Sequence, residues 1–187
     1  MSRSSLAILL MAFAVSANAE DFDYSFVQAN YNQIDIDGVG DGDAIGLGLS
    51  FAISDNFHLL GGYGQGDVDT ALGTADLMSW QAGLGFNTAL SPTIDFVADI
   101  AYVYEDVELA GVGLDENGIG VGIGLRFAVS ERVQANAGID YDDVSEETSL
   151  DLDFQFSLND SFAVGLGGSW SDDASGYGIG GRFYFGD

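Results

Sequence analysis

Strict alternation of large apolar residues with small or polar ones is the feature that most constrains the fold of this chain. Residues 44–53 read AIGLGLSFAI, and residues 118–129 read GIGVGIGLRFAV, with every second residue large and apolar. In residues 149–158, SLDLDFQFSL, the acids Asp151 and Asp153 alternate with Leu and Phe. A helix would place these acids within its apolar stripe, whereas a strand puts them on the opposite face. The pattern therefore indicates an all-β chain.

Turn and loop sequences at regular intervals divide this alternating pattern into strands. Four short turns recur, AISDNF (52–57), ALSPTI (89–94), AVSERV (128–133) and SLNDSF (157–162), and longer acidic connections lie near 35–43, 66–76, 106–117, 142–147 and 171–176. The alternation of short turns and long loops predicts a closed antiparallel up-and-down transmembrane β-barrel, which leaves no strand edge unpaired in lipid. Ten strands are expected, with eight as an alternative: 23–34, 43–53, 57–65, 77–88, 94–105, 117–129, 133–142, 148–158, 162–170 and 176–185.

The placement of the aromatic residues separates a membrane barrel from a soluble one. A soluble sandwich or lipocalin-like barrel would turn its apolar residues inward and would not sort aromatic types along the strand axis. Here Tyr and Trp gather toward the long-loop ends of the expected strands, and Phe gathers toward the tight turns. Two aromatic girdles around an aliphatic band are typical of a membrane barrel. Large apolar residues should then face lipid, and Gly, Ala, Ser, Gln, Asn and Asp should line a polar interior.

The first residues have the pattern of a secretory signal. Arg3 precedes the apolar run LAILLMAFAV (6–15), and Ala17-Asn18-Ala19 fits a cleavage site. The run is shorter than the roughly 20 residues that a membrane-spanning helix needs. We therefore expect residues 1–19 to be a signal peptide and residues 20–187 to form one barrel domain in the outer membrane of a Gram-negative type of envelope.

The charge balance limits the classes of partner. The chain has 30 acidic residues, no lysine and a formal net charge of −26, which argues against nucleic-acid binding. The expected partners are outer-membrane lipid, lipopolysaccharide and the outer-membrane assembly machinery, and the sequence names no surface partner. The last strand, YGIGGRFYF (177–185), looks like the aromatic C-terminal signature that such machinery reads.

One acidic segment is a candidate cation site. Asp35, Asp37, Asp41 and Asp43 alternate with glycines in DIDGVGDGD (35–43), and calcium prefers several oxygen ligands on a flexible backbone. The spacing does not fit the helix-loop-helix calcium pattern. Two interpretations remain open: a calcium or magnesium site, or a solvated acidic loop. No other cofactor is expected.

Charged residues are also expected inside the barrel. They support two interpretations: a conduit that favours cations, or an interior plugged by ion pairs. The residues are Asp95, Asp99, Asp140, Asp151, Asp153, Arg126 and Arg182.

No catalytic constellation is evident. His58 is the only histidine, and it lies beside the turn at 54–56, near the expected periplasmic rim. A single rim histidine is more often solvated or locally hydrogen-bonded than catalytic. We therefore expect a non-enzymatic barrel with a structural or surface-interaction role and acidic external loops; a narrow, weakly cation-selective, porin-like channel is the alternative.

The chain as a whole resembles the small outer membrane β-barrel superfamily of OmpX- and OmpA-type proteins. Within that superfamily it looks most similar to a family once discussed as the activator of a plant immune receptor. The resemblance rests on YSFVQANY (24–31), DNFHLLGGYG (55–64) and the glycine-rich strands that end at RFYF (182–185). It implies a membrane-barrel fold and an outer-membrane location, and no site residue is carried over from it.

Overall fold

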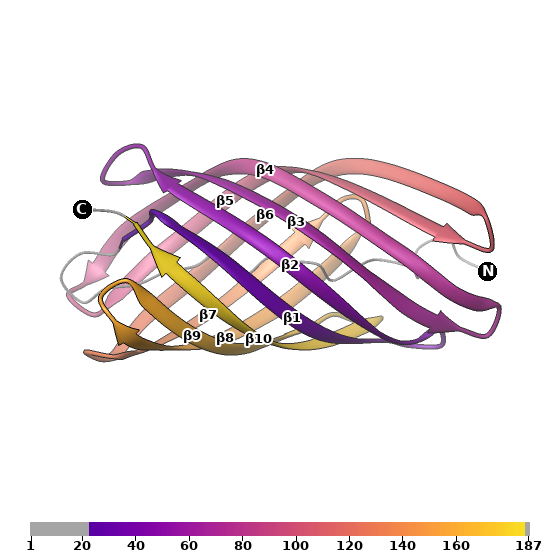
Figure 1. Cartoon of the computed structure of the whole chain (residues 1–187). Coiled ribbons are helices and arrows are strands. Elements are labelled where there is room, and N and C mark those ends of the chain that lie inside the picture. The colour runs from indigo at the N-terminus through magenta and orange to yellow at the C-terminus, as the bar shows by residue number, and fades with distance from the viewer. Residues whose placement is uncertain (1–22, 186–187) are drawn as a thin grey trace.

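Ten antiparallel strands close into one barrel. The computed structural model describes residues 23–185, and each strand pairs with its sequence neighbours while β1 pairs with β10. Figure 1 shows the strands tilted around a common axis. The strands are β1 (Phe26–Ile36), β2 (Gly40–Ala52), β3 (Phe57–Thr70), β4 (Gly73–Ser91), β5 (Ile94–Leu109), β6 (Val112–Ser130), β7 (Val133–Asp142), β8 (Glu147–Asn159), β9 (Phe162–Trp170) and β10 (Ala174–Tyr184).

The fold class and the strand number are confirmed. The two weakest expected segments, 133–142 and 162–170, are the regular strands β7 and β9, so the barrel has ten strands and not eight. The predicted signal peptide, residues 1–19, lies outside the described residues. Within residues 23–185, the structure contains no helix long and apolar enough to cross a membrane.

The outward face of the barrel is apolar around its middle. Leu47 and Ile123 are exposed, and Gly46, Gly48, Gly122 and Gly124 face the interior. The exposed large apolar residues come from every one of the ten strands, among them Val27, Leu49, Leu59, Leu84, Ile100, Val121, Ile139, Leu152, Leu166 and Ile179. A protein folded in water would bury such a surface, whereas lipid solvates it.

The tyrosine and tryptophan girdle lies on this outward face. Trp80 packs against Tyr102 at 5.4 Å and against Tyr104 at 5.9 Å between ring centroids. The Trp170 indole N–H donates to the Tyr177 hydroxyl at 3.2 Å. The Tyr63 hydroxyl donates to Gln65 at 3.1 Å, and the Tyr31 hydroxyl donates to Asp43, so these hydroxyls point toward the polar outer ends of the strands. This orientation is the one expected of aromatic residues at a membrane–water interface.

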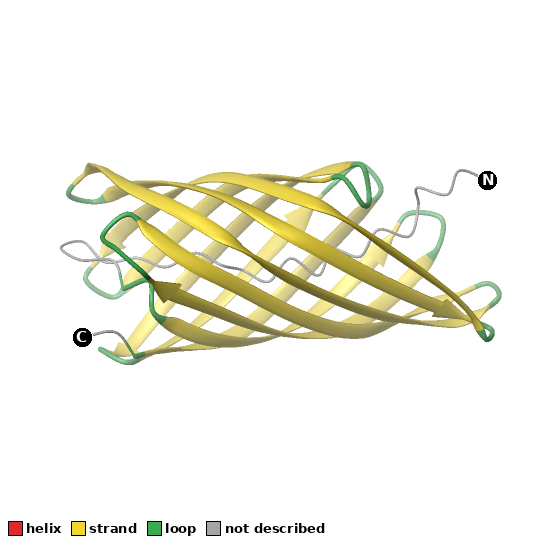
Figure 2. Ribbon diagram, turned by 90° about the horizontal axis from the view of Figure 1, so that it is seen from above, coloured by secondary structure: helices red, strands yellow, loops and turns green. Residues whose placement is uncertain are grey.

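The prediction of long acidic loops is wrong for two segments, which are strands joined by short turns. Residues 66–76 and 106–117 are mostly strand, because β3 and β4 extend to a turn at 71–72, and β5 and β6 extend to a turn at 110–111. Ala110 and Gly111 have φ of 54° and 80°, the positive values that a two-residue type I′ hairpin turn requires. Short turns therefore join the strands at both ends of the barrel (Figure 2). We call the end with turns 37–39, 71–72, 110–111, 143–146 and 171–173 the outer end.

A charge placed on the lipid-facing band should destabilise the barrel. Leu47→Arg and Ile123→Arg should each lower the free energy of unfolding by about 2–4 kcal/mol, because lipid does not solvate a guanidinium at mid-membrane depth. Urea unfolding in phospholipid vesicles measures this. Leu72→Arg is the control, because Leu72 is 77% exposed at an outer turn. An equal loss of stability in all three variants would contradict the assignment of the lipid-facing band.

Candidate functional site in the barrel lumen

Side chains from β1, β8 and β10 meet across the inner end of the lumen. The Arg182 guanidinium donates to Gln28 Oε1 from Nε at 3.1 Å and from Nη2 at 2.6 Å. Its Cζ lies 4.0 Å from the centroid of the Phe26 ring. With the Gln155 amide oxygen turned toward Arg182, that oxygen accepts at 2.8 and 3.1 Å and the amide nitrogen donates to Tyr184 at 3.2 Å. Arginine has donors only, so this orientation of Gln155 is the consistent one.

A second group of side chains covers the rest of this end. Arg126 is fully buried, and its Cζ lies 4.9 Å from the Tyr24 ring centroid. Tyr24 donates to Asp95 Oδ2 at 3.3 Å and stacks on His58 with 4.7 Å between ring centroids. We call the whole set the lumenal floor. It consists of Tyr24, Phe26, Gln28, His58, Asp95, Arg126, Gln155, Arg182 and Tyr184.

The floor places His58 differently from the expectation. Of the two expected states of His58, solvated or locally hydrogen-bonded at the rim, the solvated one is wrong, because its side chain points inward, is only 3% exposed and interacts with Asn87. Gly85 lies opposite it on β4, and a Cβ at that position would collide with the imidazole ring. The glycine therefore makes room for the histidine inside the barrel.

A group of carboxylates lies above the floor. A Cβ added at Gly122 would meet the carboxyl groups of both Asp99 and Asp140, so these two side chains converge over β6. Asp140 also interacts with Asp151 and, more weakly, with Asp153. We call Asp99, Asp140, Asp151 and Asp153 the acidic chamber. Glycines of β9 and β10 leave a cavity on one side of it, lined also by Asn30 and Asp153.

The two lumenal arginines balance only part of this charge. Arg182 and Arg126 are electrostatic partners of Asp153, and Arg126 is also a partner of Asp95. For Asp140, the charged partners within the described residues are other carboxylates. All seven lumenal charges named from the sequence thus face the interior, but they divide into a floor that holds both arginines with Asp95 and a chamber that holds only carboxylates.

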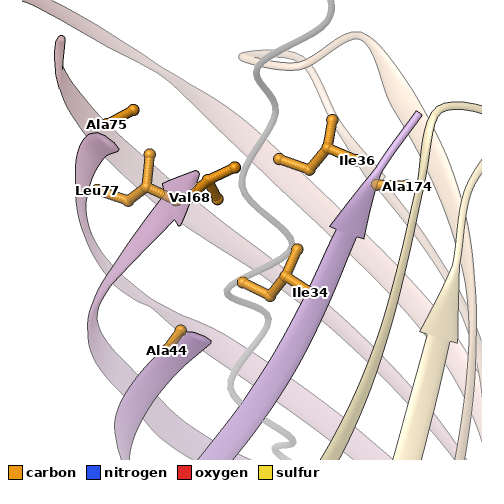
Figure 3. Packing of buried hydrophobic residues seen from close by; sticks show 7 residues of the cluster. All are labelled: Ile34, Ile36, Ala44, Val68, Ala75, Leu77 and Ala174. Carbon is orange, nitrogen blue, oxygen red and sulfur yellow. The ribbon is translucent and has the colours of Figure 1, made fainter. Parts of the chain in front are cut away.

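The outer part of the lumen is apolar, contrary to the polar interior expected throughout. Ile34, Ile36 and Val68 are at most 3% exposed. They belong to a cluster with Ala44, Ala75, Leu77 and Ala174, seen from nearby in Figure 3. We call these seven residues the apolar lining. Val39, Val107 and Leu109 pack against it.

The opposite face of the same strand extensions is acidic. Asp43 lies opposite Asp67, Asp67 opposite Asp76, and Asp76 opposite Glu108, all four exposed. This acidic row crosses four neighbouring strands. Above the aromatic girdle, therefore, the barrel wall has acids outside and mainly aliphatic residues inside, with the buried Glu105 as an exception. We call this part of β1–β6 the collar.

The candidate cation residues lie in the collar but do not converge. Asp35 lies opposite Asp41 on the exposed face, and Asp43 accepts from Tyr31. Asp37 is in the turn, where its backbone N–H donates to the Asp173 carbonyl at 2.9 Å. Within residues 23–185, no group of three or more His, Cys, Asp or Glu side chains has the geometry to hold a metal ion.

An apolar exterior, a closed sheet and a polar, narrow interior together define a transmembrane β-barrel. A family model described as the outer membrane protein beta-barrel domain matches residues 5–169. The chain belongs to this family.

Solved barrels align with most of this chain at low sequence identity. The β domain of the Bordetella autotransporter BrkA aligns with a TM-score of 0.51 and 11% identity, covering 86% of this chain and 98% of that one. The KdgM porin in complex with disordered oligogalacturonate aligns with a TM-score of 0.49 and 8% identity, covering 86% and 99%. Ail, the attachment invasion locus protein of Yersinia pestis, aligns with a TM-score of 0.43 and 11% identity, covering 86% and 97%. Among curated proteins, none matches the chain.

The floor should contribute to the stability of the barrel. Arg182→Leu removes a donor to the side-chain oxygens of Gln28 and Gln155 and one of the two cationic partners of Asp153, so we expect unfolding to become easier by about 3–5 kcal/mol. Urea unfolding in vesicles is the measurement. Arg132→Leu, at the exposed turn between β6 and β7, removes the same charge and should change stability by less than about 0.5 kcal/mol. If both variants lose the same free energy of unfolding, the loss reflects the change in net charge and not the contacts within the floor.

Proposed function

We propose that this protein is a non-enzymatic outer membrane barrel that acts at the cell surface through its acidic collar, with a lumen closed to bulk conduction. The observation that carries the proposal is the floor, in which Arg182 joins the neighbouring strands β10 and β1 and Arg126 of β6 reaches Tyr24, just before β1, on the facing wall. A barrel of this strand number is narrow enough for side chains to fill. The only histidine of the chain stacks within the floor, which supports a role other than general acid–base catalysis.

The collar supports the surface-interaction part of the proposal. Its strands project beyond the aromatic girdle and carry a row of exposed carboxylates. Such a surface attracts cationic partners and divalent ions. The narrower resemblance to a barrel family discussed for plant immune recognition is consistent with a surface role, and the partner is left to experiment.

A second candidate function is a narrow, weakly cation-selective channel. The observation that favours it is the acidic chamber, whose carboxylates exceed the arginines near them and would attract cations into the lumen. The floor is the element that separates the two candidates, because a conducting path would have to pass it.

Conductance of the refolded barrel in planar bilayers distinguishes these functions. We expect the unmodified protein to show no discrete conductance steps, and we expect an Arg126→Ala, Arg182→Ala double variant to show cation-selective steps, because it removes two large side chains and both positive charges from the floor. Recording with and without calcium tests whether the collar carboxylates alter the current. Regular cation-selective steps from the unmodified protein would favour the channel.

Calcium or magnesium at the collar is a further part of the proposal. Like charges opposite one another on adjacent strands are destabilising, and divalent ions relieve this repulsion by chelation, including by bridging to lipopolysaccharide phosphates. Millimolar calcium should therefore protect the outer hairpins from proteinase K more than sodium chloride at equal ionic strength. Replacing Asp35, Asp37, Asp41 and Asp43 with Asn should weaken the protection of the β1–β2 hairpin and leave the barrel folded. Equal protection by sodium would indicate simple screening.

A further inference from the structure

We propose that the lumen binds an amphiphilic organic cation from the outer side, with the cationic head in the acidic chamber and the apolar tail against the apolar lining. This inference goes beyond the proposed surface role, because it concerns the interior of the barrel. It is based on three separate features: a crowded set of carboxylates, buried polar atoms without partners beside them, and an aliphatic wall leading outward.

The carboxylates of the chamber crowd one another inside the barrel. Asp99 and Asp140 both point to the space above Gly122, and Asp140 is within hydrogen-bonding reach of Asp151. The charged partners of Asp140 within the described residues are Asp151, Asp99 and Asp153, while the arginines act on Asp153 from the floor side. Repulsion of this kind is relieved by an ammonium group placed among the carboxyls.

Two buried polar side chains point into the same part of the lumen without hydrogen-bond partners. Ser169 and Asn136 are each 5% exposed, and the Ser169 hydroxyl and both polar atoms of the Asn136 amide have no partner within the described residues. Ser169 lies opposite Asp151, and Asn136 lies opposite Asp153. Buried polar atoms are normally paired, so these side chains indicate a place for a polar ligand group or ordered water.

A short aliphatic stretch leads outward from the chamber. Ala101 and Val103 follow Asp99 on the lumenal face of β5, and both are buried. Val103 is roughly 14 Å from Asp99 along the strand, at about 3.4 Å per residue, which suits a chain of about eight carbons. Further along β5, the same face carries the buried Glu105, whose carboxyl adds to the negative charge of the lumen, and then Val107 and Leu109, which pack against the apolar lining.

This arrangement selects among ligand classes. An anion would be repelled by the chamber, and a neutral apolar molecule would leave its charge unbalanced. A bare metal ion would gain nothing from the apolar lining, and the described residues offer no metal-binding group of three side chains. The floor lies beyond the chamber, so the ligand is held in the lumen and not passed through it.

Binding of octyltrimethylammonium to the refolded barrel tests the proposal. The barrel is placed in phosphatidylcholine nanodiscs and titrated by calorimetry at neutral pH, with the heat of empty discs subtracted. Tetramethylammonium carries the head without the tail, octanol has the tail without the charge, and octanesulfonate reverses the charge. We expect octyltrimethylammonium to bind at least about tenfold more tightly than each of the three comparison compounds.

Variants locate the site. Asp99→Asn, Asp140→Asn and Asp151→Asn together should weaken binding by about tenfold or more, and Gly122→Ala should weaken it without any change of charge, because its Cβ intrudes between the Asp99 and Asp140 carboxyls. The double variant Ile34→Ser, Ile36→Ser should weaken the binding of octyltrimethylammonium and leave the binding of tetramethylammonium unchanged. The control is Asp35→Asn, Asp41→Asn and Asp43→Asn, which removes three charges from the outside of the collar. A shift in gel mobility on boiling verifies that each variant is folded.

The proposal is overturned by any of four results. These are equal binding of octanesulfonate, equal binding of tetramethylammonium, an equal loss in the collar control, or unchanged binding in both the triple chamber variant and Gly122→Ala. None of these results alters the conductance test, so failure of this inference and failure of the proposed function are distinguishable. If the triple variant does not fold, Gly122→Ala provides the test of the chamber on its own.

Discussion

The pairing of β1 with β10 is the constraint on which the rest of the structure depends. Within lipid no water satisfies the backbone, so every N–H and C=O must find its partner in a neighbouring strand, and an open edge is not tolerated. The seam runs from Phe26 opposite Tyr184 to Ile36 opposite Ala174 without a bulge. It also brings Gln28 beside Arg182, so the closing of the sheet and the assembly of the floor happen at one place.

Along single strands the two faces exchange character at the aromatic girdle. On β5 the outward residues change from Ile100 and Tyr102 to Asp106 and Glu108. The lumenal residues change from Asp99 to Val107 and Leu109, with the buried Glu105 just before the change. Below the girdle the barrel follows the rule of membrane proteins, with apolar residues outward. Above the girdle it follows the rule of soluble sheets. There the outward face meets water instead of lipid, so apolar side chains are more stable on the inward face, where they are buried. The collar is thus a projecting, water-exposed part of the sheet that is continuous with the membrane barrel.

The exchange of faces also explains which features the sequence could predict. Segments such as 44–53 and 118–129 alternate without interruption, so the strands, their lipid-facing residues and the inward direction of the lumenal charges could be predicted. The collar was missed because the acids at 67, 69, 106 and 108 were interpreted as loop residues, although Val68, Val107 and Leu109 continue the same alternation. The floor could not be foreseen, because contacts such as Arg126 with Tyr24 join strands that are distant in sequence and depend on the register of the whole barrel.

The positions of the few basic residues have a practical consequence for detecting this protein on cells. The chain has no lysine, and of the arginines in residues 23–185, Arg126 and Arg182 are buried in the floor while Arg132 lies at the end of the barrel opposite the collar. With the collar at the cell surface, as proposed, trypsin applied to intact cells would find no cleavage site on the collar, and amine-reactive labels would find no side-chain amine on it. Surface profiling by either chemistry would overlook the protein, whereas a protease or a coupling reagent directed at carboxylates would find a dense target.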